Sequence, residues 1–324
     1  MPGAAAGMPS PGEVSAEVSR VLTEFLDERR RDLARLQAEL PRLVDELHGV
    51  LDSGGKRIRP WLACWGYRAA DRALDESILR AASALELVHT FALIQDDVMD
   101  DSATRRGRPA AHTVLGLPTA LLLSDLALIW GDQLLCEAGF TPERLADGLR
   151  VLNALRTEVT VGQYLDVEGR PDEARALEVN RLKTASYTVL RPIQLGLALG
   201  GARRTTIDAV PAYAEPAGIA FQLRDDVLGA FGDEATTGKP AGDDLRNEKP
   251  TWLWARALAR GGAAPAGVVA RRAWLVESGA LADTEALIGE LEKQALDGLR
   301  RLPVEEARRR ELVAMTDALV RREQ

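Results

Sequence analysis

The chain has 324 residues, of which 46% are hydrophobic and 28% charged, with a formal net charge of -8. This acidic balance offers no basic face of the kind that nucleic acid requires, which argues against a nucleic-acid partner. The segment MPGAAAGMPSPGE lacks the cationic start and apolar core of a signal peptide, and no uninterrupted apolar run of about 20 residues predicts a membrane span. We therefore expect a cytoplasmic protein without stable membrane insertion, with residues 1–13 as a disordered lead-in and 14–324 as one domain.

Helical periodicity continues through most of the chain and is interrupted by clusters of glycine and proline. The predicted helices span, in chain order, residues 14–50, 60–72, 76–101, 118–138, 142–168, 173–201, 204–231, 250–261, 265–278, 281–302 and 304–322. No segment shows the alternation of a β-strand, and no linker divides the chain. The sequence therefore predicts an all-α protein built as a single large helical bundle.

Three aspartates end the apolar helix predicted at residues 76–101, in the segment LIQDDVMD. Asp96 and Asp100 are four residues apart and Asp97 and Asp100 are three apart, so on a helix all three can reach one side. Carboxylates this close repel one another unless a cation lies among them, and Mg²⁺ prefers such hard oxygen ligands. A solvated acidic helix end is the alternative interpretation of a single cluster of this kind.

A second acidic cluster, Asp225 and Asp226 in FQLRDDVLG, lies near the end of the helix predicted at residues 204–231. Further carboxylates follow it in the sequence at Asp233, Asp243 and Asp244. Helical bundles build metal sites from acidic side chains on facing helices. Two clusters in one bundle therefore favour a divalent-metal site over two solvated helix ends.

Basic residues accompany the acidic clusters. Arg105 and Arg106 follow the first cluster, and GGKRIRP at residues 54–60 places three basic side chains on a glycine loop before a helix. Arginine binds phosphate bidentately, lysine binds it as a point charge, and glycine lets the backbone approach an anion. The 41 basic residues include five lysines, namely Lys56, Lys183, Lys239, Lys249 and Lys293. The combination predicts a cavity that holds magnesium and more than one phosphorylated group.

These motifs occur in the order typical of the trans-prenyltransferases, and the chain resembles this polyprenyl diphosphate synthase family over nearly its whole length after about residue 20. The matching segments are GGKRIRP, LIQDDVMD followed by RRGRPA, GQYLD at 162–166, KTASY at 183–187, and FQLRDDVLGAFGD continuing into TGKPAGDDLRNEKPT. The resemblance implies an isoprenoid synthase-like helical bundle around a central cavity, Mg²⁺ as cofactor, and a homodimer.

The resemblance also implies roles for individual residues, with two diphosphate pockets. The residues implied for isopentenyl diphosphate are Lys56, Arg59, His89 and Arg106. Those implied for the allylic diphosphate are Arg105, Lys183, Thr184, Gln222, Lys239 and Lys249. Those implied as magnesium ligands are Asp96, Asp100 and Asp225, with Asp97 and Asp226 in supporting roles and Gln163 and Asp166 close to the metal. From the residues alone, His89 would be a core histidine, and Gln163 and Asp166 would be polar residues on a helix surface.

The implied reaction joins isopentenyl diphosphate to an allylic diphosphate such as dimethylallyl, geranyl or farnesyl diphosphate. Catalysis would rest on Asp96, Asp97, Asp100, Arg105, Lys183, Asp225 and Asp226, through charge stabilisation on the departing diphosphate. A large Phe91 beside a small Ala92 resembles synthases that make geranylgeranyl diphosphate. Helix geometry places Ala92 and Val88 closer than Phe91 to the face of Asp96, whereas the family favours Phe91 and Ala92 as the floor of the cavity.

One departure from the family pattern is Gly229, which stands at the fifth position of the second motif, where aspartate is usual. The resemblance implies that this loss is tolerable because the first aspartate of the motif is the more direct metal ligand. Three alternatives remain open: a farnesyl or longer polyprenyl diphosphate synthase, a class I terpene cyclase, and a non-catalytic regulatory subunit of a heteromeric synthase. A cyclase would not need GGKRIRP or His89, and a regulatory subunit would be expected to lose acidic motifs.

Overall fold

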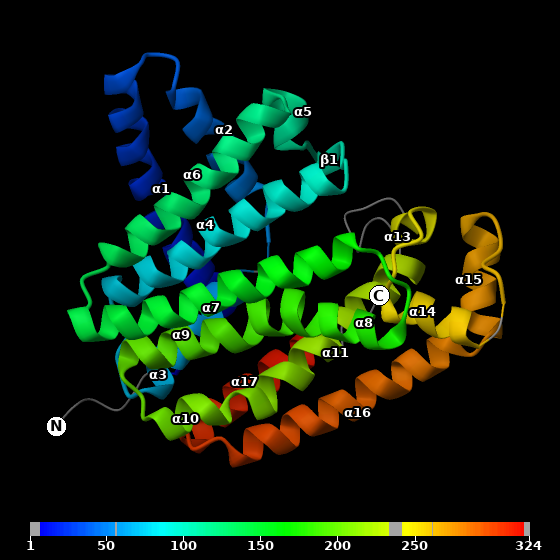
Figure 1. The fold of residues 1–324 in the computed structure, drawn as a ribbon. Helices are drawn as coiled ribbons and strands as arrows, with labels where there is room; N and C mark the ends of the chain where they lie inside the picture. Colours follow the sequence, from blue (N-terminus) through cyan, green and yellow to red (C-terminus); the bar gives the residue numbers. More distant parts are fainter. Residues whose placement is uncertain (1–6, 56, 233–241, 261, 321–324) are drawn as a thin grey trace. The chain divides into compact units, whose positions relative to one another are not determined.

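The computed structural model describes residues 7–55, 57–232, 242–260 and 262–320, and nearly all of the regular structure in these ranges is helical (Figure 1). The chain divides into two compact units, residues 1–149 with 195–201 and residues 150–194 with 202–324. Helices α7 (Pro142–Val167) and α9 (Arg191–Gly200) contribute residues to both units. The predicted all-α class is confirmed, and the prediction of one domain over 14–324 stays a prediction.

The first unit is built around the pairing of α4 with α6. The elements that lie wholly within this unit are α1 (Pro11–Leu36), α2 (Pro41–Asp52), α3 (Ile58–Ala69), α4 (Glu76–Met99), β1 (Thr104–Arg105), β2 (Arg108–Pro109), α5 (Ala111–Leu115) and α6 (Leu117–Cys136). A Cβ at Gly131 of α6 would lie 3.2 Å from Val88 Cγ2 and 3.3 Å from the Ala84 oxygen of α4. The missing side chain therefore lets the two helices approach closely, and Val88 is fully buried in their contact.

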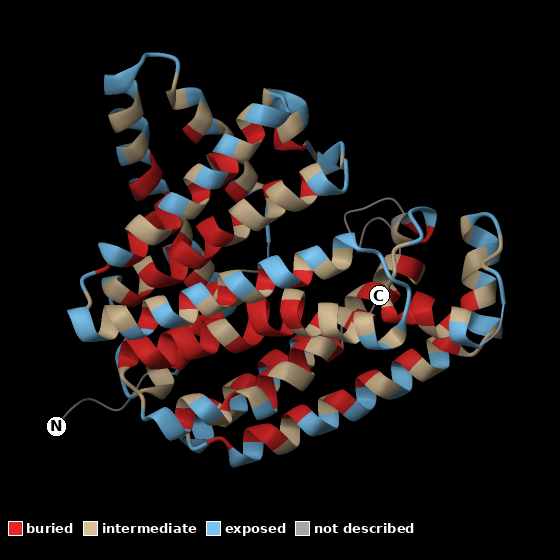
Figure 2. Ribbon diagram, viewed as in Figure 1, coloured by how far each residue is buried: buried red, intermediate tan, exposed pale blue. Residues whose placement is uncertain are grey.

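The second unit contains a π-helix, η1 (Asn180–Leu190), in the middle of a long helical segment. The other elements of this unit are α8 (Glu173–Val179), α10 (Arg204–Ala209), α11 (Pro211–Phe231), α13 (Asp243–Arg246), α14 (Trp252–Ala259), α15 (Val268–Glu277), α16 (Ala280–Arg301) and α17 (Glu306–Val320). Figure 2 shows the segment from η1 into α9 as largely buried, and residues 184–190 are all buried. A Cβ at Gly218 of α11 would lie 2.3 Å from Ala185 Cα, so glycine permits close packing of α11 on η1.

Several predicted helix boundaries were wrong at prolines that begin a helix. The helix predicted at 14–50 is two helices, and Pro41 occupies the first turn of the second, where its missing N–H costs nothing. In the same way, the helix predicted at 204–231 divides into α10 and α11, which begins at Pro211. α1 begins at Pro11, capped by the Ser10 side chain, so ordered structure starts before the predicted boundary at residue 14.

A short hairpin after α4 contradicts the prediction of no strands. Thr104 pairs with Pro109, and Arg105 pairs with Arg108. The two turn residues, Arg106 and Gly107, have φ of 51° and 75°. Positive φ at both central residues is the geometry of a type I′ turn, which suits a two-residue hairpin. The strands are too short to show an alternation in sequence.

Among the helices in the described ranges, α4 and α6 are long and apolar enough to meet a length and hydropathy criterion for membrane crossing. The criterion counts length and composition alone, and buried core helices of globular proteins satisfy it too. In α4, 61% of the qualifying window is buried inside the protein. The sequence prediction had required an uninterrupted apolar run, which neither helix contains.

Candidate active site

The first acidic cluster lies at the end of α4, and the hairpin brings a cation onto it. Arg105 Nε donates to Asp97 Oδ1 at 2.7 Å, and Arg105 Nη2 donates to Asp96 Oδ2 at 3.1 Å. Asp97 is buried and Asp96 is half-buried, whereas Asp100, the residue that caps α4, is exposed. Burial opposes the charge on Arg105, but the two carboxylates outweigh it and raise the pKa of the guanidinium. Asp97 is thus held by the protein, while Asp96 and Asp100 lie closer to solvent.

Arg108, to which the sequence assigned no role, fixes the hairpin on α2. A Cβ at Gly49 of α2 would lie 2.3 Å from Arg108 Nη1, so the guanidinium occupies the space that any other side chain would need. Glu46, one turn earlier on α2, lies 4.0 Å from Arg108 Nη2. Gly49 is the sequence feature that permits this contact.

A group of basic residues surrounds His89 in the same unit. Burial lowers the pKa of His89 well below its usual value, and the charges of Arg59, Arg106, Arg105 and Arg57 lower it further. The imidazole is therefore neutral at pH 7 and offers one donor and one acceptor. Several cations beside a neutral imidazole form a place suited to an anion.

Arg57 and Glu86 support this basic group. Arg57 caps the start of α3 in the left-handed region, with φ of 44°, and its Nη1 donates to Glu86 Oε2 at 3.4 Å. The Arg106 guanidinium lies over Gly55, where a Cβ would be 3.1 Å from Arg106 Nη1. Lys56, predicted for isopentenyl diphosphate, lies outside the described residues. Gly55 of GGKRIRP thus lies against the guanidinium of the hairpin residue Arg106.

The second unit contains a chain of hydrogen bonds that joins η1 to the second acidic cluster. Thr184 Oγ1 donates to Gln222 Oε1 at 2.6 Å, and Gln222 Nε2 donates to Asp226 Oδ1 at 2.8 Å. Burial raises the pKa of Asp226 to about 7, although the charge of Lys249 and the bond from Gln222 lower it. Asp225, the predicted ligand, is half-buried next to it. The predicted residues Thr184, Gln222, Asp226 and Lys249 are therefore brought together.

Gly229 has a structural reason that the sequence did not reveal. A Cβ at Gly229 would lie 2.1 Å from Asp244 Oδ2. The carboxylate of Asp244, from α13, thus occupies the space of the side chain that the family pattern expects at this position. A carboxylate from α13 therefore stands beside Gly229, although residue 229 itself carries none.

Helix α7 presents GQYLD to η1. Lys183 Nζ donates to Asp166 Oδ2 at 2.6 Å, and both side chains are largely buried. A Cβ at Gly162 would lie 2.8 Å from the Lys183 nitrogen, so this glycine allows close contact. Gln163 is half-buried on the same helix. Asp166 is therefore an ion-pair partner rather than a surface residue.

The remaining predicted site residues lie on α4 or outside the described residues. Lys239 lies outside the described residues. Phe91 and Ala92 are half-buried on α4, whereas Val88 packs against Gly131, as described above. The role of these three in chain length stays a prediction, as does a shared cavity for the two acidic clusters. Within the described ranges, no three carboxylate, histidine or cysteine side chains gather closely enough to enclose a metal ion.

Comparison with solved structures identifies the class of protein. A geranylgeranyl pyrophosphate synthase from Corynebacterium glutamicum, solved with isoprenyl diphosphate and magnesium, matches with a TM-score of 0.91 and 34% identity. The match covers 97% of this chain and 100% of that one. The fold is the all-α isoprenoid synthase fold.

Sequence comparison then identifies the family. The family model for polyprenyl synthetase matches residues 41–270. A (2E,6E)-farnesyl diphosphate synthase from Mycobacterium bovis is 36% identical over 266 residues, which are 80% of this chain and 72% of the relative. A short chain isoprenyl diphosphate synthase from Methanocaldococcus jannaschii is 35% identical over 218 residues, 64% of either chain. The chain belongs to the polyprenyl synthetase family, a family of prenyltransferases.

Proposed function

We propose that this protein condenses isopentenyl diphosphate with an allylic diphosphate and makes geranylgeranyl diphosphate as its main product. The observation that carries the proposal is that each unit pairs acidic and cationic side chains within family motifs. In the first unit Arg105 holds Asp96 and Asp97, and in the second unit Lys183 is held by Asp166. A terpene cyclase has no second diphosphate to bind, so the arginines around His89 favour condensation over cyclisation.

The basic group of the first unit would bind isopentenyl diphosphate. Arg59 and Arg106 supply guanidinium donors, which suit phosphate oxygens. His89, neutral because of burial and of those arginines, can donate a hydrogen bond without adding charge. Lys56 would add a point charge, as the family pattern implies. These residues place the isopentenyl group and hold its diphosphate, which does not leave during the reaction.

The allylic diphosphate would lie against Lys183 and Lys249 of the second unit, whose positive charges stabilise the negative charge that builds up on the leaving diphosphate. The resemblance gives Arg105 of the first unit a role toward the same substrate. Thr184 and Gln222 hold each other, so their polar atoms are fixed in advance and need little reorganisation. The allylic cation is attacked by the isopentenyl double bond, and loss of a proton completes the new double bond. Apolar residues of the bundle would keep water from the cation.

Magnesium fits the chemistry of the less buried acidic side chains. Arg105 binds both Asp96 and Asp97, of which Asp97 is buried and Asp96 half-buried, while Asp100 is exposed in the first unit and Asp225 is half-buried in the second. One or two carboxylates are what Mg²⁺ usually takes from a protein when phosphates and waters complete its shell. Mg²⁺ held there would supply positive charge to the departing diphosphate.

Two further properties complete the proposal. We propose a homodimer, because α5 and α6 leave a row of apolar side chains exposed that a partner can cover. The exposed fractions in this row are 51% for Val114, 51% for Leu117, 64% for Leu122 and 57% for Ile129. The product length rests on Phe91 and Ala92, and the cytoplasmic location stays a prediction.

The test is an assay of purified protein with labelled isopentenyl diphosphate and, in turn, dimethylallyl, geranyl and farnesyl diphosphate. Chromatography of the dephosphorylated products gives the chain length. A twenty-carbon alcohol supports the proposal, and a fifteen-carbon or longer alcohol supports the alternative synthases. A hydrocarbon formed without isopentenyl incorporation indicates a cyclase, and no turnover without a second protein indicates a regulatory subunit.

A further inference from the structure

Glu158 of α7 makes a contact with η1 for which the family motifs provide no role. Its Oε2 accepts from the Ser186 hydroxyl, and it also accepts from Arg191 Nε at 2.8 Å. Its Oε1 accepts from Arg191 Nη2. Ser186 is 2% exposed, and the Glu158 and Arg191 side chains are 23% and 22% exposed. The Glu158 carboxylate thus accepts three hydrogen bonds at a largely buried position.

The two residues that Glu158 joins also define the π geometry. The Arg191 N–H donates to the Ser186 oxygen, five residues earlier, which is the spacing of a π-helix. In an α-helix, residues five apart point about 140° away from each other, so one carboxylate would not reach both side chains. Glu158 therefore matches the π register of η1 and would lose one of its partners in the α register.

The register of η1 decides where the residues of KTASY lie. Inserting or removing one residue from a helical turn rotates everything beyond it by roughly 100°. Lys183, bound to Asp166, and Thr184, bound to Gln222, lie within η1, close to Ser186. A change in the register of η1 would therefore turn these side chains relative to their partners on α7 and α11. π-Helical segments are uncommon and occur often at functional sites.

Helix α7 presents one face to η1 at intervals of four residues. Glu158 binds Ser186, Gly162 packs against the Lys183 backbone, and Asp166 binds Lys183. Positions four apart on a helix lie one above the other. The same face that carries the family residue Asp166 thus carries Glu158 two turns earlier.

We propose that Glu158 is a positioning residue for the allylic side of the active site: its carboxylate holds η1 in the π register that places Lys183 and Thr184. The proposal rests on the proposed function for its kinetic consequence, and on the contacts of Ser186 and Arg191 for its structural one. Glu158 itself touches no substrate. Its effect is transmitted through η1.

The kinetic test compares Glu158→Ala and Glu158→Gln with the wild type. Misplacement of the order of 1 Å can cost about 10²-fold in rate, so Glu158→Ala is expected to lower kcat by that order and to raise the KM for the allylic substrate. The KM for isopentenyl diphosphate should be unchanged, because the residues proposed to bind it belong to the first unit. Glu158→Gln keeps the shape and one acceptor oxygen, so it should recover a large part of kcat.

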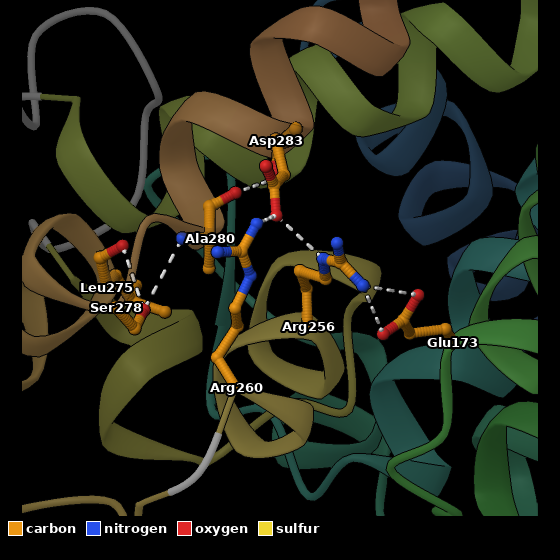
Figure 3. Close-up of polar contacts among 8 residues, drawn as sticks. Glu173, Arg256, Arg260, Leu275, Ser278, Ala280 and Asp283 are labelled. Carbon is orange, nitrogen blue, oxygen red and sulfur yellow. Dashed lines mark hydrogen bonds and ion pairs between the residues drawn. The ribbon is translucent and has the colours of Figure 1, made fainter.

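Glu173→Ala is the matched control. Glu173 accepts from Arg256 Nη1 at 3.1 Å, and Asp283 holds the same arginine through its Nε at 2.7 Å (Figure 3). These contacts are also partly buried and belong to the second unit, but they join α8 to α14 and α16 and involve neither Ser186 nor Arg191. Its loss should leave both Michaelis constants and kcat within about twofold.

A second measurement does not depend on catalysis. Amide hydrogen exchange of a peptide covering residues 180–191 should be faster in substrate-free Glu158→Ala than in the wild type and in Glu173→Ala. If exchange and kinetics are unchanged, or if both Michaelis constants rise equally, the proposal is wrong. If exchange rises but the wild type transfers no prenyl group, the proposed function fails and the structural role of Glu158 stands.

Discussion

Placing a side chain at Gly229 should show whether Asp244 occupies the position that the family gives to an aspartate. The Cβ of Gly229→Ala would lie 2.1 Å from Asp244 Oδ2 and 3.1 Å from its Cγ. Overpacking costs about 1–3 kcal/mol, and alanine in place of glycine in a helix gains roughly 1 kcal/mol. The net expectation is a destabilisation of about 0–2 kcal/mol.

The Asp244→Ala background supplies the matched comparison. With the carboxylate removed, Gly229→Ala should become stabilising by roughly 1 kcal/mol, so the two substitutions should be coupled by about 1–3 kcal/mol. Urea unfolding of the wild type, both single variants and the double variant measures this coupling. Additivity within about 0.5 kcal/mol would refute the idea that Asp244 fills this space.

The same reasoning applies to activity. Gly229→Asp restores the usual motif, yet it would place a second carboxylate against Asp244, and like charges at this distance repel. We expect the rate of Gly229→Asp to fall below that of the wild type in the labelled-substrate assay. A higher rate would show that the motif was incomplete without an aspartate at position 229.

Three further predictions address the remaining parts of the site. Lys56→Ala should raise the KM for isopentenyl diphosphate and Lys239→Ala that for the allylic substrate; steady-state kinetics that show both raising the same constant would contradict separate pockets. Phe91→Ala should lengthen the products and Ala92→Phe shorten them, and an unchanged chromatogram in both would place the floor elsewhere. Burial raises the pKa of Glu158, but the hydrogen bonds from Arg191 and Ser186 outweigh it, so the pKa lies below its usual value. The ionised carboxylate therefore stabilises the folded protein above the unfolded-state pKa of about 4.3, and this contribution is lost as the pH falls through the lower folded-state pKa. Between pH 7 and about 3, the unfolding temperature of Glu158→Gln should therefore decrease less than that of the wild type. Equal decreases would contradict this role of the Glu158 carboxylate.

The positions of the long helices could be predicted because their apolar periodicity continues over many turns. The predicted helix at 142–168 differs from α7 by one residue at its end. Pro41 and Pro211 divided two predicted helices because a proline in the first turn of a helix leaves the apolar period intact on either side. The π-helical geometry of η1 could not be predicted from the local sequence either, because the carboxylate that bonds to Ser186 and Arg191 comes from Glu158 on another helix.

The polar partners within the site show the same limit. The acidic motifs and the family pattern predicted Asp96, Lys183 and Asp225 as site residues before the structure was known. The contacts of Glu158, Glu86 and Asp244 could not be predicted, because each joins segments far apart in the chain by a single side chain. Gly229 and Gly49 mark such contacts in the sequence only as missing side chains, because the residues that fill the space, Asp244 and Arg108, come from other segments.

The central claim is most directly tested by incorporation of labelled isopentenyl diphosphate by the wild type and by Asp96→Asn, each with magnesium and with excess chelator. The wild type with magnesium should give a twenty-carbon product. Asp96→Asn, with its fold intact by circular dichroism, should lose on the order of 10²–10³ in rate, as when one electrostatic group is removed from a preorganised site. Near-normal turnover by Asp96→Asn, or full activity of the wild type in chelator, would contradict the account.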